Sequence, residues 1–182
     1  MQSKTKNLTL AAVCAALMAA GAYLRFPLPL LTVQFTTQVF FLLVTGLLLP
    51  PGYAAGAMAV YVLTGLAGFP VFSRGGGLQT ALTPEFGYLL GFVLSAFLTA
   101  LARKKMKTRR FGNLISAVIG VFAVYAAALP YAALLAVLYA GKPIAFSTLM
   151  TGYFLAFLPL DLVKAFAAAP VARQVRKALR LP

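Results

Sequence analysis

The acid–base inventory of this 182-residue chain is very small. Glu85 and Asp161 are its two acidic residues, Cys14 is its single cysteine, and it contains no histidine. Zinc and two-metal centres take their ligands from His, Cys and carboxylates, and most proton transfer needs His or a well-placed carboxylate. We therefore expect no catalytic residues, no metal site and no cofactor, and we regard an enzyme as the weakest of the possible classes.

Asp161 and Lys164 have the spacing that most strongly indicates a binding site. They lie three residues apart in an apolar segment near Pro159, and a helix would place them on one face. An ionisable side chain inside a membrane costs about 2.5–3.5 kcal/mol, so it generally faces a cavity or a partner. Lys164 is then suited to an anionic ligand group, with Asp161 orienting it. The alternative is an ion pair that only holds helices together.

The stretch from Gly65 to Phe92 is the second candidate. Phe69-Pro70 and the triple glycine Gly75-Gly76-Gly77 interrupt a helix, so we expect a loop that folds back over a cavity as a lid. Ligand sites commonly combine apolar walls with a few polar groups. The polar candidates are Arg74, Gln79, Thr80, Thr83 and Tyr88, and the apolar ones are Phe69, Phe72 and Phe86. Each of these taken singly is better explained as a solvated loop residue or an interfacial aromatic.

The elements that must position these side chains are membrane spans. Hydrophobic residues make up 62% of the chain and charged residues 10%, which is too little polar surface for a soluble domain of this length. We expect an all-α integral membrane six-helix bundle that forms one domain over residues 1–182. The expected spans are Leu8–Leu24, Val33–Leu49, Tyr53–Ala67, Phe86–Ala102, Gly112–Tyr139 and Ala145–Ala169.

Several residues predict details of these spans. Leu30 to Gln38 has an extended, β-branched character, Pro130 predicts a kink or an early end of the fifth span, and Pro159 interrupts the sixth. Glu85 is interpreted as a cap of the fourth helix. Gln34 and Gln38 are interpreted as hydrogen-bonded bundle residues.

The basic residues predict the topology. The N-terminus, the loop Arg103–Arg110 (RKKMKTRR) and the tail Arg173–Arg180 together hold twelve Lys and Arg, whereas the opposite side would hold Arg25, Arg74 and Lys142. Positive charges accumulate on the cytoplasmic side, so we expect both termini in the cytoplasm and the central loop outside. Because the charge lies beside apolar spans, it indicates topology and lipid contacts rather than nucleic acid binding, despite a net charge of +14.

The first span has alanines at four-residue spacing. Ala11, Ala15 and Ala19 would form a smooth strip along which another helix can approach closely, with Ala12, Ala16 and Ala20 beside it. A partner subunit is one interpretation of this strip. Ordinary packing inside the bundle is the other.

These motifs resemble the BioY family, the biotin-specific substrate-binding (S) components of energy-coupling factor (ECF) transporters. The resemblance rests on GLAGFPVF at residues 65–72, the glycine run, PEFGYLLGF at residues 84–92 and FLPLDLVK at residues 157–164. It covers essentially the whole chain. Glu85 departs from the family pattern, which has Pro-Thr-Gly-Gly or Pro-Thr-Phe-Gly at this point.

The resemblance implies biotin capture from outside a prokaryotic plasma membrane, without catalysis by this chain. Implied partners are membrane lipid, a transmembrane coupling subunit that meets the Ala11/Ala15/Ala19 strip, and two ATP-binding cassette ATPases. Implied biotin-site residues are Lys164 at the valerate carboxylate, Asp161 beside it, and loop groups such as Gln79 near the ureido ring, with Arg74, Tyr88 and Phe72 around them. The alternatives are an S component for thiamine or riboflavin, or a structural or regulatory membrane protein that transports nothing.

Overall fold

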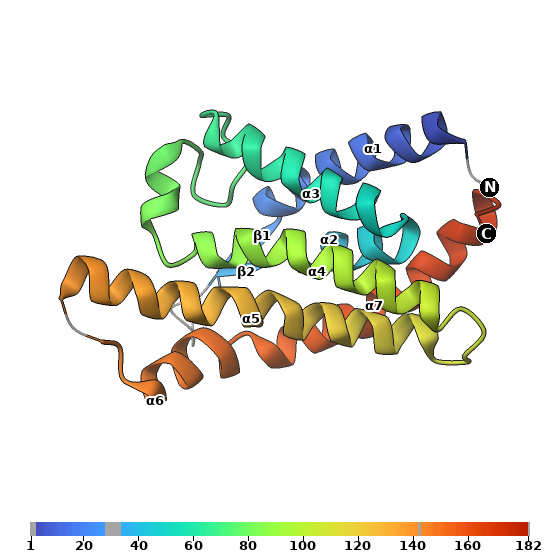
Figure 1. Ribbon diagram of the computed structural model, residues 1–182. Coiled ribbons are helices and arrows are strands. Elements are labelled where there is room, and N and C mark those ends of the chain that lie inside the picture. Colours follow the sequence, from blue (N-terminus) through green and yellow to red (C-terminus); the bar gives the residue numbers. More distant parts are fainter. Residues whose placement is uncertain (1–2, 28–33, 142, 182) are drawn as a thin grey trace.

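The computed structural model describes residues 3–27, 34–141 and 143–181, and across these ranges the chain is a bundle of helices (Figure 1). The helices are α1 (Lys4–Tyr23), α2 (Gln38–Leu48), α3 (Pro51–Leu66), α4 (Phe86–Lys105), α5 (Gly112–Ala140), α6 (Phe146–Thr148) and α7 (Leu158–Ala178). A 3-10 turn, η1 (Leu78–Leu82), lies in the central loop, and a π-helical segment, η2 (Leu149–Leu155), connects α6 to α7. The expected all-α fold is confirmed.

Four helical segments in the described ranges are long and apolar enough to cross a membrane. They are Lys4–Tyr23, Phe86–Lys105, Gly112–Tyr139 and Phe146–Ala178. Large apolar side chains point outward from them, as a lipid-facing surface requires. Leu138 on α5 and Phe166 on α7, for example, are 68% and 61% exposed.

The shorter helix α2 occupies the middle of the bundle and contacts α1, α3, α4, α5 and α7. Its leucines Leu42, Leu43 and Leu47 are completely buried. Close approach of α4 requires a glycine here, since a Cβ at Gly46 would lie 2.6 Å from the side chain of Thr99. A helix that is apolar all round suits this surrounded position.

The second span starts later than expected. α2 begins at Gln38 rather than Val33, because residues 34–36 form a short strand, β2 (Gln34–Thr36), that pairs antiparallel with β1 (Arg25–Pro27). The extended character expected for Leu30–Gln38 is confirmed at residues 34–36. Residues 30–33 of that segment lie outside the described ranges, and the side chain of Gln34 is not described. Lys142, which was counted for the topology, also lies outside the described ranges.

The two proline expectations have different outcomes. α5 continues past Pro130 to Ala140, so an early end of this span was wrong. The lost backbone hydrogen bond is outweighed by packing of α5 along α4 and α7. Pro159 does interrupt the last span: it stands in the first turn of α7, where a missing N–H costs no helical hydrogen bond.

The two ends of the bundle are formed by different segments of the chain. Figure 1 shows the two termini and the turn between α4 and α5 at one end. The long loop between α3 and α4 lies at the opposite end, as does the connection from α5 to α6. The basic segments Arg103–Arg110 and Arg173–Arg180 therefore share an end with both termini, and the candidate lid lies away from them.

Candidate functional site

A buried ion pair occupies the first turns of α7. The Nζ of Lys164 lies 2.7 Å from Oδ1 of Asp161, and the two residues are 8% and 5% exposed. The hydroxyl of Tyr125 on α5 donates a hydrogen bond to the other carboxylate oxygen, Oδ2, at 2.6 Å. Both oxygens of the carboxylate thus have a donor, which offsets part of the cost of burying it.

The local sequence explains the geometry of this pair. Pro159 places the start of α7 just before Asp161, and a carboxylate in the first helical turn interacts favourably with the helix dipole. The three-residue spacing brings Lys164 onto the same face, as expected from the sequence. The pair is therefore neutral overall and directed into the bundle.

Aromatic rings surround the pair. Tyr88, in the first turn of α4, packs edge-on against Tyr125 with ring centroids 6.1 Å apart. Its ring is tilted against that of Phe157, with centroids 5.6 Å apart. Phe154 packs against Tyr125 at 5.0 Å. The hydroxyl of Tyr88 donates to the backbone oxygen of Tyr153 in the π-helical segment. The structure thus brings Tyr88 together with Asp161 and Lys164 in one aromatic-lined region.

Phe72 connects the central loop to the bundle. Its ring is 4% exposed and packs edge-on against Tyr61, with centroids 5.5 Å apart. Gly65 leaves room for this ring, since a Cβ there would lie 2.1 Å from it. The hydroxyl of Tyr61 donates to the backbone oxygen of Val71 at 3.0 Å and accepts from the amide of Gln38 at 2.7 Å. The expected hydrogen-bonded role of Gln38 is confirmed.

The triple glycine allows the loop to fold back on α3. Gly77 has a φ of +106°, a backbone conformation that other residues rarely adopt, and its N–H donates to the backbone oxygen of Gly65 at 2.7 Å. Tyr23 at the end of α1 donates from its hydroxyl to the oxygen of Pro70, and Arg25 donates to the oxygen of Ser73 at 2.5 Å. The loop is thus hydrogen-bonded to both α1 and α3.

Arg74 and Gln79 make their contacts within this loop. Arg74 forms an ion pair with Glu85 at 3.1 Å, and the two side chains are 70% and 48% exposed. The amide of Gln79 donates to the backbone oxygen of Gly76 at 2.8 Å. Glu85 is the N-cap residue of α4, as expected, but its side chain makes no capping hydrogen bond. The carboxylate of Glu85 pairs with the guanidinium of Arg74 instead of with the N–H groups of the helix.

Sequence reasoning missed Tyr125, which holds the second oxygen of Asp161. A tyrosine within an apolar span was the available indication, because a buried tyrosine hydroxyl usually has a hydrogen-bond partner. The identity of that partner depends on how α5 packs against α7. Phe154 and Phe157 were missed for the same reason.

Comparison with protein families places nearly the whole chain in one group. Residues 1–181 match the BioY family. The chain is 34% identical over 180 residues to the probable biotin transporter BioY of Lysinibacillus sphaericus, covering 98% of this chain and 91% of that one. It is 38% identical over 122 residues to the biotin transporter BioY of Thermotoga maritima, covering 66% and 70% of the two chains.

A solved structure supports the same grouping. The fold matches the crystal structure of the S-component for biotin from an ECF-type ABC transporter with a TM-score of 0.81 and 26% sequence identity. The match covers 97% of this chain and 95% of that one.

Proposed function

Since this chain belongs to the BioY family, we propose that it is the biotin-binding S component of an ECF-type vitamin transporter in the cell membrane. The observation that carries this proposal is the structural match of almost the whole chain to an S-component for biotin. The protein is a transport component, and ATP hydrolysis belongs to its partners. Residues 1–182 would form one membrane-embedded binding domain.

The buried pair is suited to the acidic end of biotin. Biotin carries a carboxylate at the end of an aliphatic chain, and Lys164 offers a buried ammonium group to it. Asp161 holds that ammonium group in place, and Tyr125 in turn holds Asp161. Tyr88 and Phe72 would supply apolar surface to the rest of the ligand, and Gln79 and Arg74 polar contacts near the ureido ring.

The loop around Gly75, Gly76 and Gly77 would act as the lid. In the described structure it is hydrogen-bonded to α1 and α3, and the buried ring of Phe72 packs against α3. Tyr88, which packs against Tyr125, the hydrogen-bond partner of Asp161, follows Gly77 by eleven residues. Movement of this loop when a ligand enters would therefore change the packing around the buried pair.

The partners follow from the ECF assembly. The transmembrane coupling subunit would meet α1 along Ala11, Ala15 and Ala19, which are half-buried at the edge of the core, with the exposed Ala12, Ala16 and Ala20 alongside. Two ATP-binding cassette ATPases would supply the energy, and lipid would surround the rest. The basic end of the bundle, which holds both termini, would face the cytoplasm.

Replacement of Lys164 tests the site. Lys164→Ala should weaken biotin binding by about 100-fold or more, because it removes a buried charged contact and leaves Asp161 with an unpaired charge. Binding is measured by equilibrium titration of the detergent-purified protein. Lys105→Ala, at an exposed position on α4, is the matched control and should bind as the wild type does. Unchanged affinity in Lys164→Ala would remove this lysine from the site.

Identification of the bound molecule tests the function itself. Mass spectrometry of the protein purified from cells should find biotin, and titrations with thiamine and riboflavin should give no binding at the same concentrations. Tighter binding of either vitamin would assign a different ligand. A protein that retains and binds none of the three would be a structural or regulatory membrane protein instead.

A further inference from the structure

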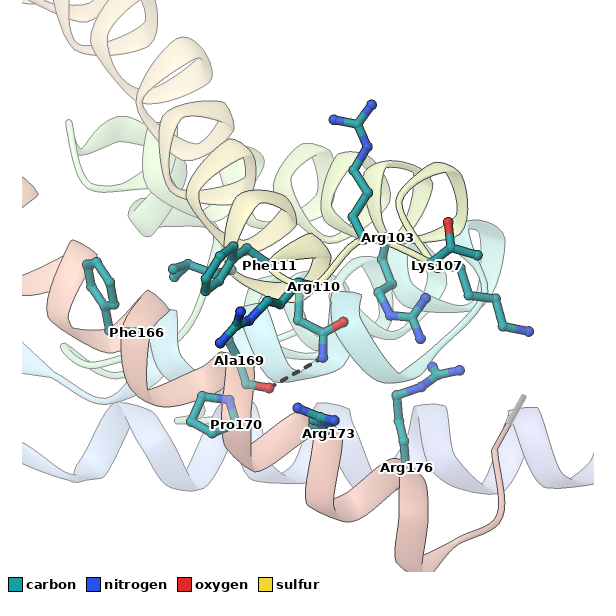
Figure 2. Close-up of a pocket in the computed structure, with 13 residues that line it drawn as sticks. Arg103, Lys107, Arg110, Phe111, Phe166, Ala169, Pro170, Arg173 and Arg176 are labelled. Carbon is teal, nitrogen blue, oxygen red and sulfur yellow. Dashed lines mark hydrogen bonds between the residues drawn. The ribbon is translucent and has the colours of Figure 1, made fainter.

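A cavity lies at the end of the bundle that holds both termini. It has a volume of about 600 Å³ and lies between the α4–α5 turn and the last turns of α7 (Figure 2). Its basic lining residues are Arg103, Lys107, Arg109, Arg110, Arg173 and Arg176. We call this cavity the basic pocket. Figure 2 shows Arg103, Arg110, Arg173 and Arg176 arranged around one space.

No acidic side chain of the chain is available to neutralise these six charges. Glu85 pairs with Arg74 at the opposite end, and Asp161 pairs with Lys164 inside the bundle. These are the only two acidic residues in the sequence. Since clustered like charges destabilise a folded structure, the basic pocket favours an anion from outside the chain.

Two arginines of the pocket differ in their hydrogen bonding. Within the described part of the chain, the Nε of Arg103 is buried and has no hydrogen-bond acceptor. The neighbouring Arg176 is held in place, because it donates to the backbone oxygens of Leu47 and Leu48 at 3.1 and 3.4 Å. A buried donor without an acceptor is costly, so an added acceptor at Arg103 would be favourable, since none of the described residues supplies one.

The rim of the pocket is apolar. Phe111 and Phe166 both line it, and they are 60% and 61% exposed. They stand where α5 begins and where α7 faces outward, next to the lipid-facing surface of the bundle. An occupant that carries a phosphate on one side and hydrocarbon on the other would satisfy the arginines and both rings.

We propose that the basic pocket binds the phosphate group of an anionic phospholipid. Guanidinium groups match phosphate oxygens in paired hydrogen bonds, and basic pockets between membrane helices bind anionic headgroups. A free phosphate from solution shares the headgroup's chemistry but leaves Phe111 and Phe166 without an apolar partner. Arg173 lies nine residues beyond Lys164, about 14 Å further along α7, so this site is separate from the proposed biotin site.

A matched pair of double variants tests the pocket. Arg103→Gln with Arg173→Gln removes two charges from inside it. Lys104→Gln with Lys105→Gln removes two charges from exposed positions on the same helix end, outside the lining. The purified proteins in a neutral detergent are titrated with phosphatidylglycerol, with phosphatidylcholine of the same acyl chains, and with sodium phosphate at constant ionic strength. Stabilisation against thermal unfolding gives the apparent affinity.

The wild type should bind phosphatidylglycerol about tenfold or more tightly than phosphatidylcholine, since the latter has no net negative charge. The pocket variant should lose about tenfold or more of this affinity, while the lysine control keeps it. If sodium phosphate binds saturably to the wild type and not to the pocket variant, the pocket recognises phosphate. The ligand would then be free phosphate from solution rather than a lipid headgroup. Equal binding of both lipids, or equal losses in both double variants, would overturn the proposal.

Biotin titration separates a pocket effect from a folding defect. The pocket variant should bind biotin as the wild type does, because its changes lie far from Lys164. If the double variant does not fold, the single variant Arg173→Gln at an exposed position replaces it, with Lys104→Gln as its control. An unchanged lipid affinity in Arg173→Gln would then overturn the proposal.

Discussion

At the level of single residues, the hydroxyl of Tyr125 determines how Asp161 shares its charge. One carboxylate oxygen faces the tyrosine and the other faces Lys164. In the proposed site, the tyrosine takes part of the negative charge of Asp161, so that Lys164 can also interact with the carboxylate of biotin. The buried arrangement is thus a three-residue unit rather than the isolated pair visible in the sequence.

Tyr125→Phe tests this three-residue unit. Loss of the hydroxyl leaves one oxygen of Asp161 without a donor, at a cost of about 1–3 kcal/mol, and strengthens the competition of Asp161 for Lys164. Biotin affinity should fall by about tenfold in an equilibrium titration. Tyr139→Phe, at a position that is 64% exposed, is the control. Equal affinities in the two variants would show that the hydroxyl only fills space.

At the level of elements, the central loop is held by its fit against α3. The ring of Phe72 lies over Gly65, and the hydroxyl of Tyr61 holds the backbone at Val71. These contacts give the loop a defined position against α3 without making it part of a helix. Arg74 lies near the tip of the loop and its side chain is exposed. The accessibility of Arg74 therefore indicates where the loop lies.

Gly65→Leu should displace the loop, because a side chain at this position overlaps the ring of Phe72. Trypsin should then cut after Arg74 about tenfold faster than in the wild type, as followed by the mass of the fragments. Gly56→Leu is the matched control on the same helix, since a Cβ at Gly56 meets no atom within 4 Å. Equal cleavage rates would mean that Phe72 does not hold the loop.

Helix α1 is the element that we propose for partner contact. Ala15→Leu should reduce biotin uptake by cells that contain the complete transporter, because a larger side chain keeps an approaching helix at a distance. The purified variant should bind biotin normally. Ala167→Leu, at an exposed position on α7, controls for the added volume. Normal uptake in Ala15→Leu would place the partner on another surface.

At the level of the whole molecule, the bundle is polarised along its length. Both termini and the two basic segments occupy one end, and the Gly-rich loop occupies the other (Figure 1). The positive end is expected in the cytoplasm. The proposed lid would then face the outside, where biotin arrives, and the basic pocket would face the inner leaflet.

Two single-cysteine variants test this orientation. In a Cys14→Ala background, Leu78→Cys places a thiol at a loop position that is 74% exposed, and Thr108→Cys places one at an exposed position in the α4–α5 turn. A membrane-impermeant maleimide should label Leu78→Cys in intact cells, and Thr108→Cys after permeabilisation alone. The reverse pattern would invert the proposed topology.

The sequence by itself determined the class of protein and the position of most helices, because hydropathy and the effects of Pro and Gly act within a single segment. Apolar length predicted the first, fourth and fifth spans to within a few residues, and the i,i+3 spacing predicted that Asp161 and Lys164 share a face. It misplaced the start of α2, since the pairing of β1 with β2 joins residues that lie from seven (Pro27 and Gln34) to eleven (Arg25 and Thr36) positions apart.

Contacts between distant segments were decided by the tertiary structure alone. Tyr125 meets Asp161 from 36 residues away, and the basic pocket joins Arg103 to Arg173 across two helices. The pairing of Arg74 with Glu85 belongs to the same group. Such contacts depend on how whole helices and loops pack against one another, and a local sequence pattern does not predict that packing.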